Sequence, residues 1–142
     1  MTREDIADLM ARRQDAFDRR DVEALSSMHA VDGIVETPLG GGTARGRQAI
    51  EDVYRTAFHA WAPTTTFHQE ELLIDDDRAV SVQRISGTDS GGIMGMPPTG
   101  RPFVIVVAHI LSFRDGAIAK ERRIYDFTGF LAQLGIIKVK PA

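Results

Sequence analysis

The hydrophobic positions in the first part of the chain repeat at the spacing of an α-helix. Thr2 can cap a helix over residues 6–17, and a shorter apolar pattern over residues 22–28 predicts a second helix. A third helix is predicted to begin near Arg47 and to end before Pro63, because the residue before a proline disfavours helical geometry. Its apolar face carries Ile50, Tyr54, Phe58 and Trp61.

The remainder of the chain is predicted to form β-strands joined by turns. Asp115 and Gly116 separate two β-rich runs, which is a strong signal for a tight hairpin. Helices grouped at the start and antiparallel strands at the end are typical of an α+β domain. The expected strands cover residues 31–37, 67–74, 79–87, 103–113 and 117–128, and a last helical turn covers residues 129–134.

The longest expected strand, residues 103–113, is apolar on both of its faces. Alternate residues from Phe103 to Phe113 form one face, those from Val104 to Ser112 form the other, and nearly all of them are apolar. A strand with one face in water should instead alternate apolar and polar residues. We therefore expect the helices to cover one face of the sheet and a second copy of the chain to cover the other, which makes a homodimer.

Composition and charge exclude several classes of protein. The 142 residues suit one domain, and residues 1–142 contain no repeat, low-complexity segment or linker. A formal net charge of -3 argues against a protein that binds nucleic acid through a positive surface. No apolar run approaches the ~20 residues that span a bilayer, and the polar start of the chain is unlike a signal peptide. We therefore expect a cytoplasmic domain with no nucleic-acid or membrane partner.

The sequence offers no convincing metal site. It contains no cysteine, which excludes thiolate ligands, disulfides and cysteine nucleophiles. His68 and Glu70 share a strand face, but no third ligand has a matching spacing. We therefore predict that the protein holds no metal ion.

Two polar residues interrupt the apolar strands and are candidates for chemistry. His109 lies on the apolar face of the longest strand, where a histidine held by a neighbouring side chain explains it equally well. Asp126 lies in the apolar and aromatic segment 124–127, where loss of water would raise its pKa toward the range that a general acid or base needs. The alternative for Asp126 is an ion pair with Arg122 or Arg123.

Short motifs occur at defined positions along the whole chain. They are Asp21-x-x-Ala24-Leu25, Gly46-Arg47, Gly87-Thr88, Pro97-Pro98-Thr99-Gly100-Arg101, Arg114-Asp115-Gly116 and Gln133-Leu134-Gly135, together with Glu121 and Asp126. In this combination they resemble the SnoaL-like polyketide cyclase family, which is part of the cone-shaped superfamily named after nuclear transport factor 2 (NTF2). The loop over residues 88–100 is long for a plain connection, which favours a role as a lid or an interface.

The resemblance implies an NTF2-like cone, in which N-terminal helices pack on a curved antiparallel or mixed β-sheet and enclose an apolar pocket. It also implies a homodimer, no cofactor, and a small apolar or polyketide-like ligand. The implied activity is an intramolecular aldol condensation that closes a polyketide ring, with Asp126 as acid and base and His109 assisting. A hydroxyl of Tyr125 or Tyr54 would donate a hydrogen bond to the developing oxyanion. The residues expected to bind substrate are Tyr54, Phe58, Trp61, Gln83, Asp89, Met94, Phe103 and Arg122.

Three other functions remain open at this point. Epoxide hydrolysis would need two carboxylates and a guanidinium group around a water molecule, which Asp126, Asp89 and Arg122 could supply. Isomerisation of a ketone, as in ketosteroid isomerase, would need a carboxylate base inside an apolar cone. The cone could also hold an apolar small molecule without any reaction.

Overall fold

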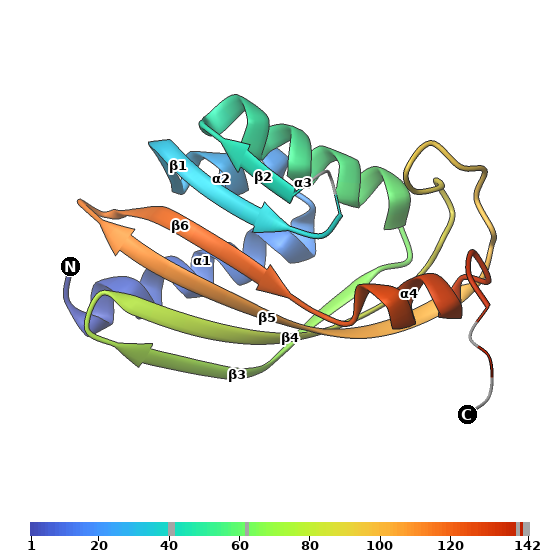
Figure 1. The fold of residues 1–142 in the computed structure, drawn as a ribbon. Helices are drawn as coiled ribbons and strands as arrows, with labels where there is room; N and C mark the ends of the chain where they lie inside the picture. Colours follow the sequence, from blue (N-terminus) through green and yellow to red (C-terminus); the bar gives the residue numbers. More distant parts are fainter. Residues whose placement is uncertain (40–41, 62, 139, 141–142) are drawn as a thin grey trace.

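A computed structural model describes residues 1–39, 42–61, 63–138 and 140 of the chain. Within them, four helices pack against one six-stranded mixed β-sheet, so the predicted α+β architecture is confirmed (Figure 1). No helix in these ranges combines the length and the apolar character that a membrane span requires. The helices are α1 (Arg3–Arg19), α2 (Val22–Ser27), α3 (Arg47–Trp61) and α4 (Phe127–Gln133). The strands are β1 (His29–Thr37), β2 (Gly42–Arg45), β3 (Thr66–Asp75), β4 (Arg78–Thr88), β5 (Pro102–Arg114) and β6 (Ala117–Ile124).

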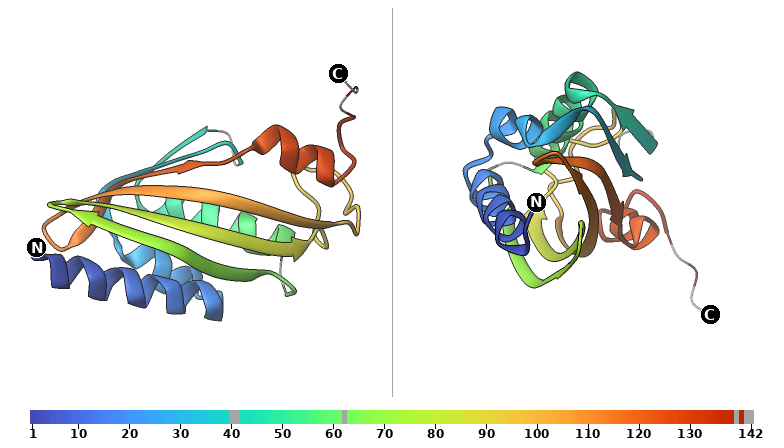
Figure 2. Two further views of the ribbon diagram at one scale, coloured as in Figure 1. Left: turned by 90° about the horizontal axis from the view of Figure 1, so that it is seen from below. Right: turned by 90° about the vertical axis from the view of Figure 1, so that its left-hand side faces the viewer.

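The sheet is curved and open, with strand order β2-β1-β6-β5-β4-β3. β1 runs parallel to β6, and the other neighbouring pairs are antiparallel. The curved sheet wraps around an interior that α1 and α3 cover from the other side, and α4 lies at one end of the sheet (Figure 2). This arrangement is the cone that the sequence predicts, and it places the inner faces of β4, β5 and β6 opposite α3.

Local sequence signals explain where several elements begin and end. Thr2 caps α1 through a reciprocal pair of hydrogen bonds with Asp5, and Arg20 adopts a left-handed backbone conformation after the helix, with φ of 54°. Asp115 and Gly116 both have positive φ in the tight turn between β5 and β6. The capping and turn chemistry read from the sequence is therefore present in the fold.

One strand end and one short strand differ from the sequence-based prediction. β6 ends at Ile124 instead of continuing to residue 128, because Asp126 caps α4, which begins at Phe127. The short edge strand β2, which pairs with β1, was not predicted, since Gly42–Arg45 is too short and too polar to show an alternating pattern. The first of these differences changes the direction in which the side chains around residue 126 point.

Apolar side chains fill both ends of the interior. At one end, Ile6, Leu9 and Leu111 are buried between α1 and the sheet. At the other end, Phe103 packs against Trp61 and the α4 residue Phe130, with ring centroids 5.5 and 5.1 Å away. These two clusters leave the middle of the cone for the site described below.

The outer face of the sheet is apolar and only partly covered. Val104 and Val106 on β5 are 46% and 44% exposed, and Ile124 on β6 is 48% exposed. The expectation that both faces of the longest strand are covered is therefore not met within one chain. A second copy that covers this face stays a prediction.

Candidate active site

A cavity lies between α3 and the inner face of the sheet. Its empty volume is about 560 Å³, part of which is open to solvent. Phe17, Val53, Phe58, Phe67 and Val107 form most of its apolar wall. Mostly apolar walls with a few polar groups are typical of a small-molecule site.

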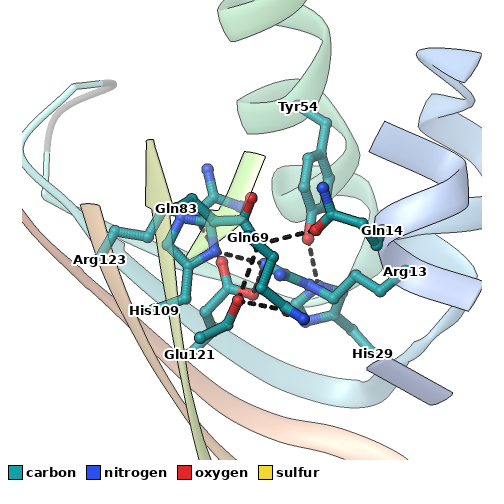
Figure 3. A network of polar contacts seen from close by, with 10 residues as sticks. Arg13, Gln14, His29, Tyr54, Gln69, Gln83, His109, Glu121 and Arg123 are labelled. Atoms are coloured by element: carbon teal, nitrogen blue, oxygen red, sulfur yellow. Dashed lines mark hydrogen bonds and ion pairs between the residues drawn. The ribbon is translucent and has the colours of Figure 1, made fainter. Parts of the chain in front are cut away.

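A buried network of charged side chains adjoins this cavity and shares His109 and Arg123 with its wall (Figure 3). Arg13 on α1 contacts Glu121 on β6, with 2.6 Å between Nη2 and Oε1, and these side chains are only 1% and 0% exposed. The second oxygen of Glu121 accepts a hydrogen bond from Nε of Arg123 at 2.5 Å. Glu121 thus holds two guanidinium groups from two different elements.

The protonation states in this network follow from burial and from the two guanidinium groups. Burial lowers the pKa of His29 to about 4 and the pKa of His109 well below its usual range, so both are neutral at pH 7. Burial alone would raise the pKa of Glu121, but Arg123 and Arg13 outweigh it and hold that pKa well below its usual range. The carboxylate is therefore ionised and is a weak base.

The tautomer of His109 is set by Arg13. Nδ1 of His109 lies 2.9 Å from Nη2 of Arg13. A guanidinium nitrogen can only donate, so Nδ1 accepts and the ring hydrogen is on Nε2. His109 also lines the cavity, and Nε2 is the ring nitrogen that does not contact Arg13. The imidazole can therefore offer a hydrogen-bond donor to a ligand oxygen.

Three other residues that line the cavity each carry a buried hydrogen-bond donor that lacks an acceptor among the described residues. The donors are Nε1 of Trp61, the hydroxyl of Tyr125 and Nη2 of Arg123. Burial raises the pKa of Tyr125 to about 12, although the charge of Arg123 acts against it, so the phenol keeps its proton. Buried polar groups are nearly always paired, so these three donors are candidates for contact with a ligand oxygen.

Several of the predicted site residues lie on this wall, and two lie behind it. Tyr54, Phe58, Trp61 and His109 line the cavity, and the hydroxyl of Tyr54 is 2.8 Å from Nε2 of His29. Gln83 and Phe103 do not line it. Gln83 is buried and donates to Gln14 and Ser81, and Phe103 belongs to the aromatic cluster at the end of the cone.

The predicted position of Asp126 is wrong. Its side chain is exposed, and Oδ1 accepts a hydrogen bond from the backbone of Gly129 at 2.8 Å as the cap of α4. The physical reason is that Glu121 and Arg123 face inward on β6, so position 126 would share the outer side of Arg122 even in a longer strand, and the chain instead turns into α4, which Asp126 caps. Asp126 does not line the cavity, and it keeps its water.

Arg122, Asp89 and Met94 also lie elsewhere. Arg122 points to the outer face of β6, where Nε is 3.3 Å from a carboxylate oxygen of Glu36. Asp89 is fully buried, but its carboxylate accepts hydrogen bonds from Gly92 and Thr99 and so organises the long loop. Met94 is 54% exposed. None of the three lines the cavity, so the group of Asp126, Arg122 and Asp89 that epoxide hydrolysis would need is not assembled there.

Arg13, Glu121 and Arg123 are the residues of the network that the sequence patterns do not assign to the site, although Glu121 is part of the family motifs. Arg13 follows the apolar residue Met10 by three positions and precedes Phe17 by four, so it falls on the buried stripe of α1. Glu121 and Arg123 alternate with outward-facing neighbours on β6 and so share its inner face. A charged residue on an otherwise apolar face is rarely buried without a partner, and this signal would have found all three.

The sequence matches the profile of the SnoaL-like polyketide cyclase family over residues 7–134. A search of curated protein sequences finds no significant match. Among solved structures, the chain is 30% identical to IdmH of Streptomyces antibioticus, which is named as a candidate polyketide cyclase. The match covers 91% of this chain and 97% of that one, with a TM-score of 0.74.

Two further solved structures share the fold at lower identity. TsrD of Streptomyces laurentii is 23% identical, with coverage of 96% and 99% of the two chains and a TM-score of 0.81. A candidate SnoaL-like polyketide cyclase of Jannaschia sp. CCS1 is 14% identical, with coverage of 95% and 94% and a TM-score of 0.84. At these identities the likeness supports the NTF2-like cone and no more.

Proposed function

The chain belongs to the SnoaL-like polyketide cyclase family, and we propose that it closes a ring in an oxygen-rich, polyketide-like molecule by an intramolecular aldol condensation. The observation that carries the proposal is the set of buried, unpaired donors of Trp61, Tyr125 and Arg123 on one apolar wall. A ligand that matches this wall combines an apolar skeleton with several carbonyl or hydroxyl oxygens. A folded polycarbonyl chain has both properties.

Ring closure of a folded polycarbonyl molecule needs no cofactor. A carbon between two carbonyl groups loses a proton, and the resulting enolate is delocalised over the substrate's own oxygens. This carbon then bonds to the carbon of a further carbonyl group in the same molecule, and the π electron pair of that carbonyl moves onto its oxygen. The new alkoxide takes up a proton, so the proton lost from carbon is balanced and no oxidant or reductant is consumed.

The residues on the wall can serve the two requirements of this reaction. Trp61 and Tyr125 donate to oxygens that do not react and hold the chain in one folded register, which makes the reaction effectively unimolecular. The Nε2–H of the neutral His109 polarises the carbonyl that is attacked and stabilises its developing negative charge. Neutral imidazole plays this electrophilic role in triosephosphate isomerase.

The test is ring closure of a synthetic substrate in which a 1,3-diketone is tethered to an aryl ketone. Mass spectrometry and NMR detect a product with the mass of the substrate, or with that mass less one water. Tyr125→Phe removes one donor with little change of shape, Trp61→Phe removes one donor together with part of the ring, and each is expected to lower kcat/KM about tenfold. Arg122→Gln on the outer face is the control and should leave the rate unchanged. Equal rates in all four proteins would contradict the proposed roles.

A second candidate function is the binding of the same class of molecule without reaction. It is favoured by one observation, which is that among the described residues of the cavity wall none is an aspartate or a glutamate. Binding of the tethered diketone without any product, over a series of tether lengths, would support this function and refute the first.

A further inference from the structure

The network that adjoins the cavity has one more positive charge than negative charge. Arg13 and Arg123 are both cations, because arginine stays protonated in proteins, and Glu121 is the anion that they share. His29 and His109 are neutral. Tyr54 is a neutral phenol, because burial raises its pKa further above the ordinary value. One guanidinium charge therefore has no counter-charge within this network.

The surplus charge reaches the cavity at Arg123. Arg13 contacts other protein groups. Its Nη2 contacts both Glu121 and His109, and its guanidinium carbon lies 4.7 Å from the ring centroid of Phe17. Arg123 uses Nε for Glu121 and lies over the ring of Tyr54, 4.9 Å from its centroid. Its Nη2 has no acceptor among the described residues, and Arg123 lines the cavity. None of the described residues that line the cavity is an aspartate or a glutamate, so no acidic side chain of the wall supplies the missing negative charge.

We propose that the cavity binds its ligand as a monoanion, with the ionised oxygen on Nη2 of Arg123. A cation in apolar surroundings is unfavourable without a partner, and an ionised oxygen is the acceptor that restores both the charge balance and the missing hydrogen bond. The ionised oxygen belongs to an enolate, a phenolate or a carboxylate on an apolar skeleton, and the enolate assignment rests on the proposed function. Trp61 and Tyr125 then remain for neutral oxygens of the same ligand.

This binding mode changes how ring closure would begin. The substrate loses its proton to solvent and binds as the enolate, so no side chain of the protein has to act as the base. The enolate carbon forms the new bond, the attacked carbonyl oxygen becomes the alkoxide, and that oxygen takes its proton from water at the open side of the cavity. The proton count is the same as in the reaction above.

The probe for this proposal is 7-hydroxycoumarin, whose absorption distinguishes the phenol from the phenolate. If the cavity prefers the anion, the bound probe ionises at lower pH than the free probe, by about one pKa unit for a tenfold preference. The neutral 7-methoxycoumarin should bind about tenfold more weakly than the phenolate. Coumarin-3-carboxylate and its amide form a second pair, which tells whether a carboxylate is accepted as well.

Three variants at two neighbouring positions sharpen the test. Arg123→Gln removes the surplus charge and leaves the balanced pair of Arg13 and Glu121, so it should fold and should bind both members of each pair equally. Arg123→Lys should retain part of the preference. Arg122→Gln is the matched control, because Arg122 lies on the opposite face of β6 and should keep the full preference.

The outcomes separate this proposal from the proposed function. An unshifted or raised pKa of bound 7-hydroxycoumarin in the wild-type protein, or equal affinity for the charged and neutral members of both pairs, would overturn the anion site. An anion preference without turnover of the tethered diketone would leave the site intact and refute ring closure. Turnover without an anion preference would support ring closure and refute the anion site.

Discussion

Replacing Glu121 by glutamine should destabilise the fold far more than replacing Arg13 by methionine, because the two changes move the buried charge in opposite directions. Glu121 contacts Arg13 at 2.6 Å and Arg123 at 2.5 Å, in a region where the three side chains are at most 10% exposed. Glutamine leaves two buried guanidinium groups without a counter-charge. Removing one partner of a buried ion pair costs about 3–5 kcal/mol, out of a stability of about 5–15 kcal/mol for a domain.

Arg13→Met acts in the other direction and should be milder. It keeps the pair of Arg123 and Glu121 and brings the buried charge of the network to zero. The cost is one ion pair and the hydrogen bond to Nδ1 of His109, partly offset by the similar length and the apolar character of methionine, so we expect about 1–3 kcal/mol.

Urea unfolding at neutral pH, followed by circular dichroism, measures both free energies. Equal slopes with respect to urea show that the two variants differ in stability and not in the compactness of the unfolded state. The reasoning is refuted if Arg13→Met is as destabilising as Glu121→Gln within about 0.5 kcal/mol. The same result would also contradict the surplus positive charge on which the anion site depends.

Three further predictions concern the cap of α4, the buried histidines and the outer face of the sheet. Asp126→Asn should keep both the fold and ring closure, whereas Asp126→Ala should lower the free energy of unfolding in urea by about 1 kcal/mol through loss of the helix cap. Loss of turnover in the asparagine variant alone would show that Asp126 takes part in the reaction. The pKa of His29 falls from 6.5 to about 4 on folding, so between these pH values the unfolded chain binds a proton that the folded chain does not. Stability should therefore fall as the pH is lowered from 6.5 to about 4, by roughly 3 kcal/mol from His29 and further from His109. An unchanged urea midpoint over this window would show that the histidines are not buried as neutral groups. Val106→Glu on the exposed face of β5 should convert a homodimer into monomers in sedimentation velocity, and a monomeric wild-type protein would refute the predicted dimer.

The fold could be predicted from the sequence because its signals are local. The capping pair of Thr2 and Asp5, the turn at Asp115 and Gly116, and the apolar stripe of α3 each act within a few residues and agree with one another. Membership of the cone superfamily then follows from motifs that lie at turns and helix ends, where backbone conformation restricts the choice of residue.

The site could be predicted only in part, because a strand end decides which side chains face inward. Side chains alternate between the faces of a strand, and beyond the end of β6 this alternation no longer says which way a residue points. An expected strand up to residue 128 places Asp126 on the same face as Arg122, and the structure has Arg122 outside and Asp126 in a helix cap. Tyr54 and Trp61 escape this error, since their helical stripe is long and has no ambiguous end.

The charged network could not be derived from the sequence for a different reason. Arg13 and Glu121 are 108 positions apart, and no local pattern pairs them. His109 and Arg123 face each other in the register of β5 and β6, which becomes visible only when the hairpin is aligned from its turn. The sequence therefore gives each charged residue a face but not a partner, and the sign of the charge at the cavity depends on the partners.

That sign favours one mechanism over another inside the same cone. A carboxylate base needs surroundings that raise its pKa, and here two guanidinium groups lower the pKa of Glu121. A surplus cation instead suits an enolate, and in the proposed reaction the substrate would keep one negative charge as that charge moves from the enolate to the new alkoxide. Because Arg123 would stabilise the anion before and during bond formation, it contributes mainly to binding, whereas a donor that meets the charge only at the new alkoxide contributes to the rate. Arg123→Lys should therefore change KM more than kcat, and a substitution of His109 should change kcat more than KM; a fall in kcat alone in the lysine variant would contradict this division of roles.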